Sequence, residues 1–480
     1  MPIIKLPIAK GSYQSESLAL SSQRCINWIP VIPQSAAVNN RALFPSPGLS
    51  QLGSTGLSPN RGAMTMKGIA YFVNGTALYS TSSTGVSSNL GAIEGLNRVS
   101  LANNGRYLVV VVPSGKSYAY DNEGGSLAEI IDPDFRASDT VVFKDGYFVF
   151  SSSDGTVFFN SALNNPFVFD SLDFGTAEIS PDLIVALHVN HNELFVCGEE
   201  TIELFQNVGG AGFPFQRIPG ANIQKGVHAK HSLVEFDNTF LFIGGGLNEG
   251  SSAWKVSGSS SAQKISTSAI DTAIQDFNET EISNCFSWTY SANGSFFAGF
   301  TFSSDRIPSK TFVYDATTSA LGGSHEWHER QTGVTDHRWR VNSIVAAYGK
   351  TLVGDSENGR IGVIDDSLYT EYGETIVRER TTEAYPSDIP LVVGELKMTV
   401  ESGVGLTDGQ GADPQIMMSY SDDGARTFSS EFWRSLGKKG EYTVYPTWRR
   451  QGRIPSQRVL RFRVTDPVKA VIIKLEADVI

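Results

Sequence analysis

The sequence predicts an all-β protein whose main body is a β-propeller, preceded by an extended N-terminal arm and followed by a small C-terminal β-domain or extension. Its 480 residues include 47 Gly and 20 Pro, and only 18% are charged, which is typical of many short strands and tight turns. One unit of strands and turns recurs through the middle of the chain. Apolar residues at helical spacing occur in one short segment.

The recurring unit consists of an apolar strand, a tight Asn/Asp/Gly turn, a second apolar strand, a Gly/Ser turn and a third strand. Seven copies occur, at 68–85, 100–121, 141–161, 183–207, 232–257, 287–319 and 343–365. One such meander cannot bury both of its faces alone, whereas radial stacking buries each sheet against the next. We therefore expect a propeller of six or seven blades over residues 56–375. A pair of β-sandwiches and a β-solenoid are the alternatives.

The segments outside the repeats have other patterns. Residues 1–55 predict an extended arm that wraps the body or a neighbour, because six prolines interrupt them: Pro2, Pro7, Pro30, Pro33, Pro45 and Pro47. Residues 376–480 predict a separate β-rich domain or a strand-rich extension of the propeller. The one expected helix spans 268–282, where Ile270, Ile274 and Phe277 stand at helical spacing.

Charge and cysteine content exclude several classes of protein. With 38 Lys+Arg against 50 Asp+Glu the formal net charge is −12, which argues against an evenly basic nucleic-acid coat. Cys25, Cys197 and Cys285 are far apart and odd in number, the pattern of buried thiols in a reducing compartment. The apolar start of the chain is interrupted by Pro7 and Lys10, so we expect neither a secretory signal nor stable insertion into a membrane.

A basic strip stands out near the C-terminus. Residues 431–480 contain eleven Lys/Arg and five acids, a local balance of +6. Strand alternation in RVLRFRVTD places Leu460, Phe462 and Val464 on one face and Arg461 and Arg463 on the other. We expect the arginines to contact an acidic protein partner, with DNA contact as the alternative. The candidate interface residues are Arg449, Arg450, Arg453, Arg458, Arg461 and Arg463.

No motif predicts catalysis or a cofactor. SGKS at 114–117 lacks the first glycine of a phosphate-binding loop and precedes a strand. His325 and His328 in HEWHE lack a third metal ligand and predict a surface loop. Four other histidines are expected to flank strands: His188, His191, His228 and His231. The acid pairs Glu199–Glu200 and Asp365–Asp366 match the two carboxylates of a glycosidase in type alone, and we expect them to be surface acids.

The segment SDDGARTF at 421–428 resembles the aspartate box of sialidase-like propellers, S-x-D-x-G-x-T-W. Its members are Ser421, Asp423, Thr427 and Phe428, with Ala425 in place of the glycine and Phe428 in place of the tryptophan. In that box the Asp accepts hydrogen bonds from turn amides and the aromatic ring packs beneath the hairpin. The box is a folding device, so it implies no hydrolysis.

Several segments together resemble the packaged-DNA stabilisation proteins, also called tail accessory or nozzle proteins, of short-tailed phages. They are MPIIKLPIAKGSY at 1–13, CINWIPVIPQ at 25–34, LFPSPGL at 43–49, the run from CGEETIELF to FLFI at 197–243, and YPTWRRQGRIPSQRVLRFRVTDPVKAVI at 445–472. The likeness follows the order of the chain and covers most of it.

The resemblance implies a non-enzymatic virion protein with no cofactor, made in the bacterial cytoplasm and located in the tail. Such proteins typically form a hexameric ring below the portal and adaptor rings, close the channel after packaging and retain the genome. The ring anchors tail fibres or spikes and the needle or tip, and touches genomic DNA transiently at ejection. An acidic lumen would let DNA slide past. The alternatives are a propeller glycosidase or lyase, or a glycan-binding tail protein, acting on host surface polysaccharide.

Overall fold

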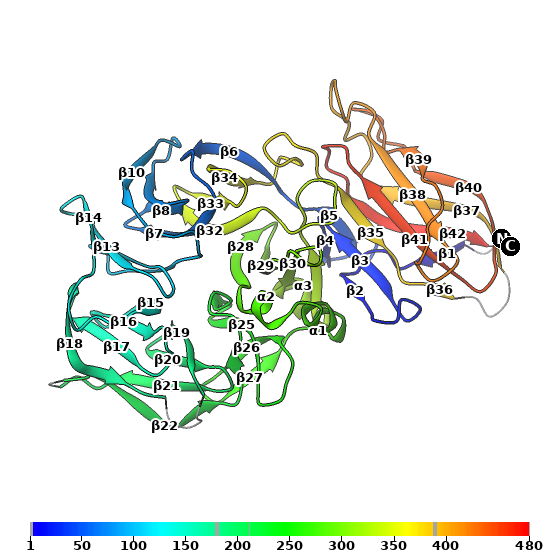
Figure 1. The fold of residues 1–480 in the computed structure, drawn as a ribbon. Coiled ribbons are helices and arrows are strands. Elements are labelled where there is room, and N and C mark those ends of the chain that lie inside the picture. The colour runs from blue at the N-terminus through cyan, green and yellow to red at the C-terminus, as the bar shows by residue number, and fades with distance from the viewer. Residues whose placement is uncertain (1–2, 178–181, 211, 387–390, 480) are drawn as a thin grey trace.

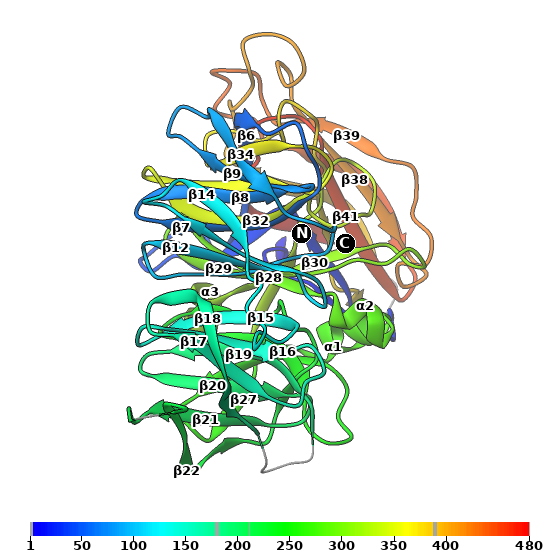
Figure 2. The same cartoon turned by 60° about the vertical axis from the view of Figure 1, so that its left-hand side comes forward.

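Seven sheets arranged radially form a β-propeller, and a two-sheet β-sandwich follows it (Figure 1, Figure 2). The computed structural model describes residues 3–177, 182–210, 212–386 and 391–479. The predicted all-β propeller fold is therefore confirmed, and the described residues form seven blades.

The blades follow one another along the chain. Blade 1 comprises β7 (Asn60–Met66), β8 (Ile69–Asn74), β9 (Ala77–Thr81) and β10 (Ser87–Ala92), and blade 2 comprises β11 (Ser100–Asn103), β12 (Tyr107–Val111), β13 (Ser117–Asp121) and β14 (Ser126–Glu129). Blade 3 comprises β15 (Ser138–Lys144), β16 (Tyr147–Ser152), β17 (Phe158–Ala162) and β18 (Asn165–Gly175), and blade 4 comprises β19 (Ile184–Asn190), β20 (Glu193–Gly198), β21 (Ile202–Asn207) and β22 (Phe215–Ile223).

The last three blades differ from a simple four-stranded meander. Blade 5 has a fifth strand, blade 6 carries a helix between two of its strands, and blade 7 takes one strand from the N-terminal segment. Blade 5 comprises β23 (Gly226–Val227), β24 (Val234–Phe236), β25 (Thr239–Gly245), β26 (Ser252–Ser257) and β27 (Ser261–Lys264). Blade 6 comprises β28 (Phe286–Ala292), β29 (Ser295–Phe302), β30 (Lys310–Asp315) and β31 (Glu326–Glu329), and blade 7 comprises β32 (Val341–Ala347), β33 (Lys350–Asp355), β34 (Arg360–Asp365) and β6 (Gly48–Ser54). Each of the seven predicted repeats falls within one blade.

Tight turns between the first strands of a blade explain this regularity. Asp145–Gly146 in blade 3 and Asn293–Gly294 in blade 6 have positive φ at both positions, 49° and 89° in the first pair and 51° and 77° in the second. This backbone matches the right-handed twist of a hairpin, and Asn, Asp and Gly adopt it at the lowest cost.

Hydrophobic residues between neighbouring blades build the core. In β12, Leu108 and Val110 pack with residues of blade 1, while Val109 and Val111 pack with residues of blade 3. All four side chains are fully buried, which explains why this run is apolar at successive positions. Similar clusters fill every blade boundary, and one of them joins Phe72 of blade 1 to Leu352 of blade 7.

The N-terminal strand β6 closes the ring of blades. It is antiparallel to β34, with Asp365 opposite Gly48 and Arg360 opposite Ser54. The first and last parts of the propeller sequence therefore share one sheet, which leaves no gap between blade 7 and blade 1.

In the part of the chain that the structure describes, helices occur at two places. The predicted helix at 268–282 is present as α1 (Ser268–Gln275) and α2 (Glu279–Ser283), separated where the side chain of Asn278 caps α2. A further helix, α3 (Ala316–Gly322), lies between β30 and β31. The prediction of a single helix missed it, although Asp315 accepts a hydrogen bond from the backbone N–H of Thr318 as an N-cap.

The C-terminal domain stacks two sheets that include N-terminal strands. One sheet contains β4 (Trp28–Val31), β5 (Ala42–Pro45), β42 (Ile472–Val479), β37 (Leu391–Val400) and β40 (Thr447–Ile454), with β1 (Ile3–Leu6) paired to β42. The other contains β3 (Ser22–Ile26), β35 (Arg378–Thr381), β41 (Gln457–Val464), β38 (Gln415–Ser421) and β39 (Phe432–Ser435), with β2 (Tyr13–Gln14) and β36 (Tyr385–Pro386) at its margins. Trp28, Met418, Trp448 and Phe462 are among the buried residues between the sheets.

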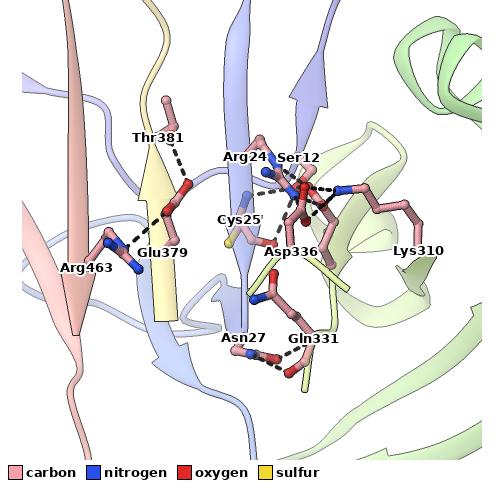
Figure 3. A network of polar contacts seen from close by, with 11 residues as sticks. Ser12, Arg24, Cys25, Asn27, Lys310, Gln331, Asp336, Glu379, Thr381 and Arg463 are labelled. Atoms are coloured by element: carbon pink, nitrogen blue, oxygen red, sulfur yellow. Dashed lines mark hydrogen bonds and ion pairs between the residues drawn. The ribbon is translucent and has the colours of Figure 1, made fainter. Parts of the chain in front are cut away.

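Strand β3 connects the two domains. It lies between β31 of blade 6 and β35 of the sandwich, so that a single sheet runs from the propeller into the C-terminal domain. Arg24 on β3 binds both carboxylate oxygens of Glu329, at 3.2 and 2.6 Å, and also Asp336 (Figure 3). Burial opposes ionisation of Glu329, but Arg24 outweighs it and holds the pKa of this carboxyl below its ordinary value.

Asn27, which follows β3, occupies the centre of this junction. Its amide nitrogen donates to the carbonyl oxygens of Gln331 at 2.9 Å and Val377 at 2.8 Å, and its amide oxygen accepts from the N–H of Gln331. Asn27 is fully buried with a φ of 53°, a conformation that Asn tolerates better than most residues. One side chain thus links the arm, the propeller and the segment that leads to β35.

We predict that Asn27→Ala lowers the free energy of unfolding by about 3 kcal/mol more than Asn293→Ala does, because only Asn27 leaves buried polar groups unpaired. Asn293 has a similar φ of 51° but is exposed, so it controls for the backbone conformation. Urea denaturation followed by tryptophan fluorescence measures both values. Equal losses for the two variants would contradict the role assigned to Asn27.

Glu371 is a buried carboxyl in the segment that joins the two domains. Its Oε1 accepts a hydrogen bond from the indole N–H of Trp339 at 2.7 Å, and its backbone lies beside Leu49 of β6. Burial raises its pKa to about 7, against the opposing effect of the neighbouring Arg330. The folded state therefore binds this proton more tightly than the unfolded chain does.

A raised carboxyl pKa contributes stability that is complete below about pH 4.5 and is lost as the pH rises through 7. We predict that Glu371→Gln gains stability relative to the wild type by up to about 3 kcal/mol between pH 4.5 and pH 8. Unfolding free energies of both proteins at several pH values test this. A difference that does not change with pH would show that Glu371 titrates normally.

Candidate interaction surface of the C-terminal domain

The β40–β41 hairpin carries all six arginines of the predicted basic strip. Its two strands belong to different sheets of the sandwich, so the hairpin crosses from one layer to the other. In β41 the expected alternation is confirmed, because Leu460, Phe462 and Val464 are buried while Arg461 and Arg463 are half-buried on the opposite face. The arginines nevertheless fall into two groups with different surroundings.

Three of the arginines are held by their own chain. Arg458 is buried, binds both oxygens of Asp422 at 2.6 and 2.7 Å, and lies over the ring of Tyr420. Arg461 lies over the ring of Phe428 at 4.1 Å. Arg463 pairs with Glu379 and Glu431, at 3.5 and 3.1 Å, and Figure 3 shows its contact with Glu379 beside the domain junction. These contacts stabilise the sandwich and occupy most of the guanidinium groups.

The other three arginines are exposed on β40. Arg449 pairs with Glu395 at 3.0 Å but keeps 79% of its side chain exposed. Arg450 and Arg453 are exposed and make no ion pair with any residue of the described ranges. A partner of this domain would therefore meet Arg449, Arg450 and Arg453 before the other three.

The aspartate-box-like turn lies at the end of β38. The carboxylate of Asp423 accepts hydrogen bonds from the backbone N–H groups of Arg426 and Thr427 and from the hydroxyls of Ser421 and Thr427. These bonds, with the Ser421 hydroxyl foremost, hold the pKa of Asp423 far below its ordinary value. Ala425 has a φ of 67°, which explains why a glycine suits this position better.

Exposed aromatic residues form a feature that the sequence analysis missed. Phe432 and Trp433 of β39 and Tyr442 and Tyr445 of the loop before β40 are 39%, 55%, 74% and 48% exposed. In the described residues only one other large aromatic side chain, Phe174, is as exposed. The sequence carried no signal, because an aromatic residue in a strand is usually buried.

The histidines differ from expectation at two positions, because His188, expected to flank a strand, lies within β19, and His328 lies within β31. HEWHE was predicted to be a surface loop, but Glu326–Glu329 form β31 and His328 is buried against the ring of Phe297. Burial lowers the pKa of His328 to about 3, so it packs as a neutral residue. The error has a physical reason, since β31 is covered on both sides by sheet neighbours that the local sequence does not reveal.

The acid pairs lie in different places. Glu199 and Glu200 line a hollow of about 930 Å³ between blades 3, 4 and 5 and the α1–α2 segment. Phe277 is the only Phe, Tyr or Trp among the described residues of its lining, so the hollow offers no broad aromatic shelf for a sugar. Asp365 ends β34 and accepts hydrogen bonds from Ser367 in a turn, and Asp366 follows the strand.

Two searches of the described residues gave negative results. No three His, Cys, Asp or Glu side chains come together in a way that would hold a metal ion. None of the helices within the described ranges is long and apolar enough to cross a bilayer.

Two family models match the chain in succession. Residues 4–369 match the model described as Bacteriophage P22 Gp10, beta-propeller, and residues 378–480 match the model described as Bacteriophage P22 Gp10, beta-sandwich. No curated protein matches the chain.

Similar solved structures include the computationally designed Ika8 protein, which is 16% identical over 66% of this chain and 99% of that chain, with a TM-score of 0.37. The N-terminal domain of Nup159 is 12% identical over 69% of this chain and 97% of that chain, with a TM-score of 0.38. These likenesses are too distant to carry an argument.

We predict that Arg458→Met destabilises the protein by about 2 kcal/mol, because it leaves Asp422 without its bidentate partner, whereas Arg453→Met changes stability by less than about 0.5 kcal/mol. Thermal and urea unfolding of the two variants measure the contrast. Equal effects at the two positions would mean that the division into structural and exposed arginines is wrong.

Proposed function

We propose that this chain, which belongs to the Bacteriophage P22 Gp10 family and is a structural protein of a phage tail, forms the tail nozzle or hub of a short-tailed phage. Six copies mount as a ring below the portal and adaptor rings after DNA packaging and close the channel. The ring retains the genome, anchors tail fibres or spikes and the needle or tip, and conducts DNA at ejection. The protein is assembled in the host cytoplasm and ends in the virion.

The observation that carries this proposal is the pair of family matches, since together they include residues 4–369 and 378–480 in the order of the chain. A propeller alone would carry little weight, because propellers host enzymes, glycan-binding proteins and scaffolds alike. The succession of this propeller and this sandwich is more specific.

The contacts between the two domains support a role in resisting the pressure of packaged DNA. The continuous sheet through β3 and the buried pair of Arg24 and Glu329 connect the propeller to the sandwich. Arg380 of the sandwich donates to the carbonyl oxygen of Gly11, whose own N–H donates to Glu326 of blade 6. A protein that holds pressurised DNA needs domains that do not hinge apart, and such cross-domain contacts resist hinging.

The exposed arginines on β40 supply a contact surface for a neighbouring copy or for the adaptor. Arginine forms bidentate pairs with carboxylates, which suits an acidic protein partner. The net charge of −12 fits a channel that repels phosphates, so that DNA passes without sticking. A channel lined mainly by Lys and Arg in the assembled ring would contradict this second idea.

We predict that the purified chain binds DNA-filled, tail-less heads at the single portal vertex, forms a ring there and prevents loss of DNA. Mass measurement of the mixture and imaging of the particles test this, with empty heads that lack the adaptor as the control. Failure to load the vertex would overturn the proposal. Clearing of capsule or lipopolysaccharide by the same preparation would instead favour the glycan-directed alternative.

A further inference from the structure

The exposed aromatics and the exposed arginines of the sandwich lie on two neighbouring strands, β39 and β40, and on the loop that precedes β40. We call this surface the aromatic–arginine edge and define it by Trp433, Arg434, Tyr442, Tyr445, Arg449 and Arg453. Arg434 donates to the carbonyl oxygen of Thr447, which ties β39 to β40. Lys397 lies over the ring of Tyr445 and pairs in register with Thr447, so the loop before β40 also belongs to this surface.

Both sheets of the sandwich end at this surface. Within the described ranges, β39 pairs only with β38, and β40 pairs only with β37. Each strand therefore has one side outside any ladder, where side chains satisfy the carbonyl oxygens of Phe432 and Thr447. Trp, Tyr and Arg are the residues most enriched where proteins bind tightly to one another, which favours a protein partner for this edge.

Negative charge is concentrated in a different part of the chain, within the propeller. Residues 121–203 contain sixteen Asp and Glu against two Lys and Arg, a balance of −14, which exceeds the net charge of the whole protein. This stretch includes blade 3 and its neighbours in the propeller. The charge is thus strongly asymmetric, with acidic blades and a basic sandwich edge.

Two of these acids, Asp134 and Asp170, lie beside exposed apolar side chains at the outer strand of blade 3. We call this surface the β18 ledge and define it by Ile131, Asp134, Val168, Asp170, Leu172 and Phe174. The apolar members are 79%, 46%, 77% and 38% exposed at positions 131, 168, 172 and 174. Arg136 donates to the carbonyl oxygen of Ser171 and lies over the ring of Phe174, which joins the 131–136 loop to β18.

We propose that the aromatic–arginine edge of one copy docks on the β18 ledge of the next copy. The two surfaces complement each other in charge, acid against arginine, and both offer exposed apolar groups beside an unpaired sheet edge. This inference rests on the proposed ring, for which it identifies the contact between neighbours.

The positions of the two surfaces suit a ring. Figure 1 shows β18 and the β39–β40 edge at opposite ends of the molecule, with the propeller and the domain junction between them. A contact between different surfaces at opposite ends is heterologous, so each copy can bind one neighbour on each side. A surface that paired with itself would stop at a dimer.

Charge reversal on either side tests the contact. The edge variant is Arg449→Glu with Arg453→Glu, the ledge variant is Asp134→Lys with Asp170→Lys, and the control is Lys67→Glu with Lys350→Glu, two exposed lysines of other blades. Sedimentation of full-length protein over a range of concentrations should show self-association weakened about tenfold or more in the edge and ledge variants, and unchanged in the control.

Mixing the edge and ledge variants sharpens the test. The ledge of the edge variant and the edge of the ledge variant are both intact, so one contact can form between them. The other two surfaces carry glutamate on the edge and lysine on the ledge, which are again opposite in charge, so the mixture should recover larger assemblies that neither variant forms alone. A mixture that forms no complex while the wild type assembles overturns the inference, and so does an edge or ledge variant that assembles alone as the wild type does.

A second measurement covers the case in which the free wild type remains monomeric. Leu172→Cys with Tyr442→Cys, loaded on filled heads and treated with a flexible bifunctional thiol reagent, should give a ladder of linked copies, whereas each single variant should not. Cys25, Cys197 and Cys285 are fully buried and do not interfere. An intact ring without a ladder overturns the inference and leaves the proposed function standing. Failure of the wild type to load the vertex overturns the proposed function, while self-association in solution still decides the contact.

Discussion

The placement of β3 between the propeller and the sandwich is the constraint on which the rest of the structure depends. Residues 3–54 contribute strands to both sheets of the sandwich and to blade 7, and β1, β3, β5 and β6 among them pair with strands more than 300 residues away. Neither domain is complete without this segment. The buried Arg24–Glu329 pair is costly to form in the wrong place, since a lone charge there would lose hydration without a partner. The pair therefore determines the position of the arm as well as stabilising the arm in that position.

The sequence predicted what depends on neighbouring residues. The blades could be predicted because alternation and Asn/Asp/Gly turns act over a few residues. The surroundings of Arg458 could not, because its partner Asp422 is 36 residues away in the chain. His328 was misplaced for the same reason, since its burial comes from Phe297 and from strands paired on both sides of β31. Helix α3 was missed although Asp315 and Gly323 cap it, because the strand pattern before it was extended too far.

The candidate surface, too, could be predicted only where its features depend on residues that are close in the sequence. Residue types indicated a basic strip, and the strand period correctly separated Leu460 from Arg461. Which arginines are free follows from the placement of Asp422, Glu379 and Phe428, which only the folded chain reveals. The exposed Trp433 lies on β39, which hydrogen bonds join to β40 with its free arginines, whereas the sequence of β39 looks like that of an ordinary strand.

Unpaired edges at β18, β39 and β40 would be a liability in a protein that remained a monomer, because exposed strands recruit other chains without control. The distribution of charge limits that risk. Two acidic ledges repel each other, as do two arginine edges, so like surfaces of two copies do not associate readily. The unlike pair is attractive, and its surfaces lie at opposite ends of a molecule whose domains are coupled by β3. Charge thus selects the head-to-tail contact, and the coupling through β3 gives successive contacts a constant angle, which closure into a ring requires.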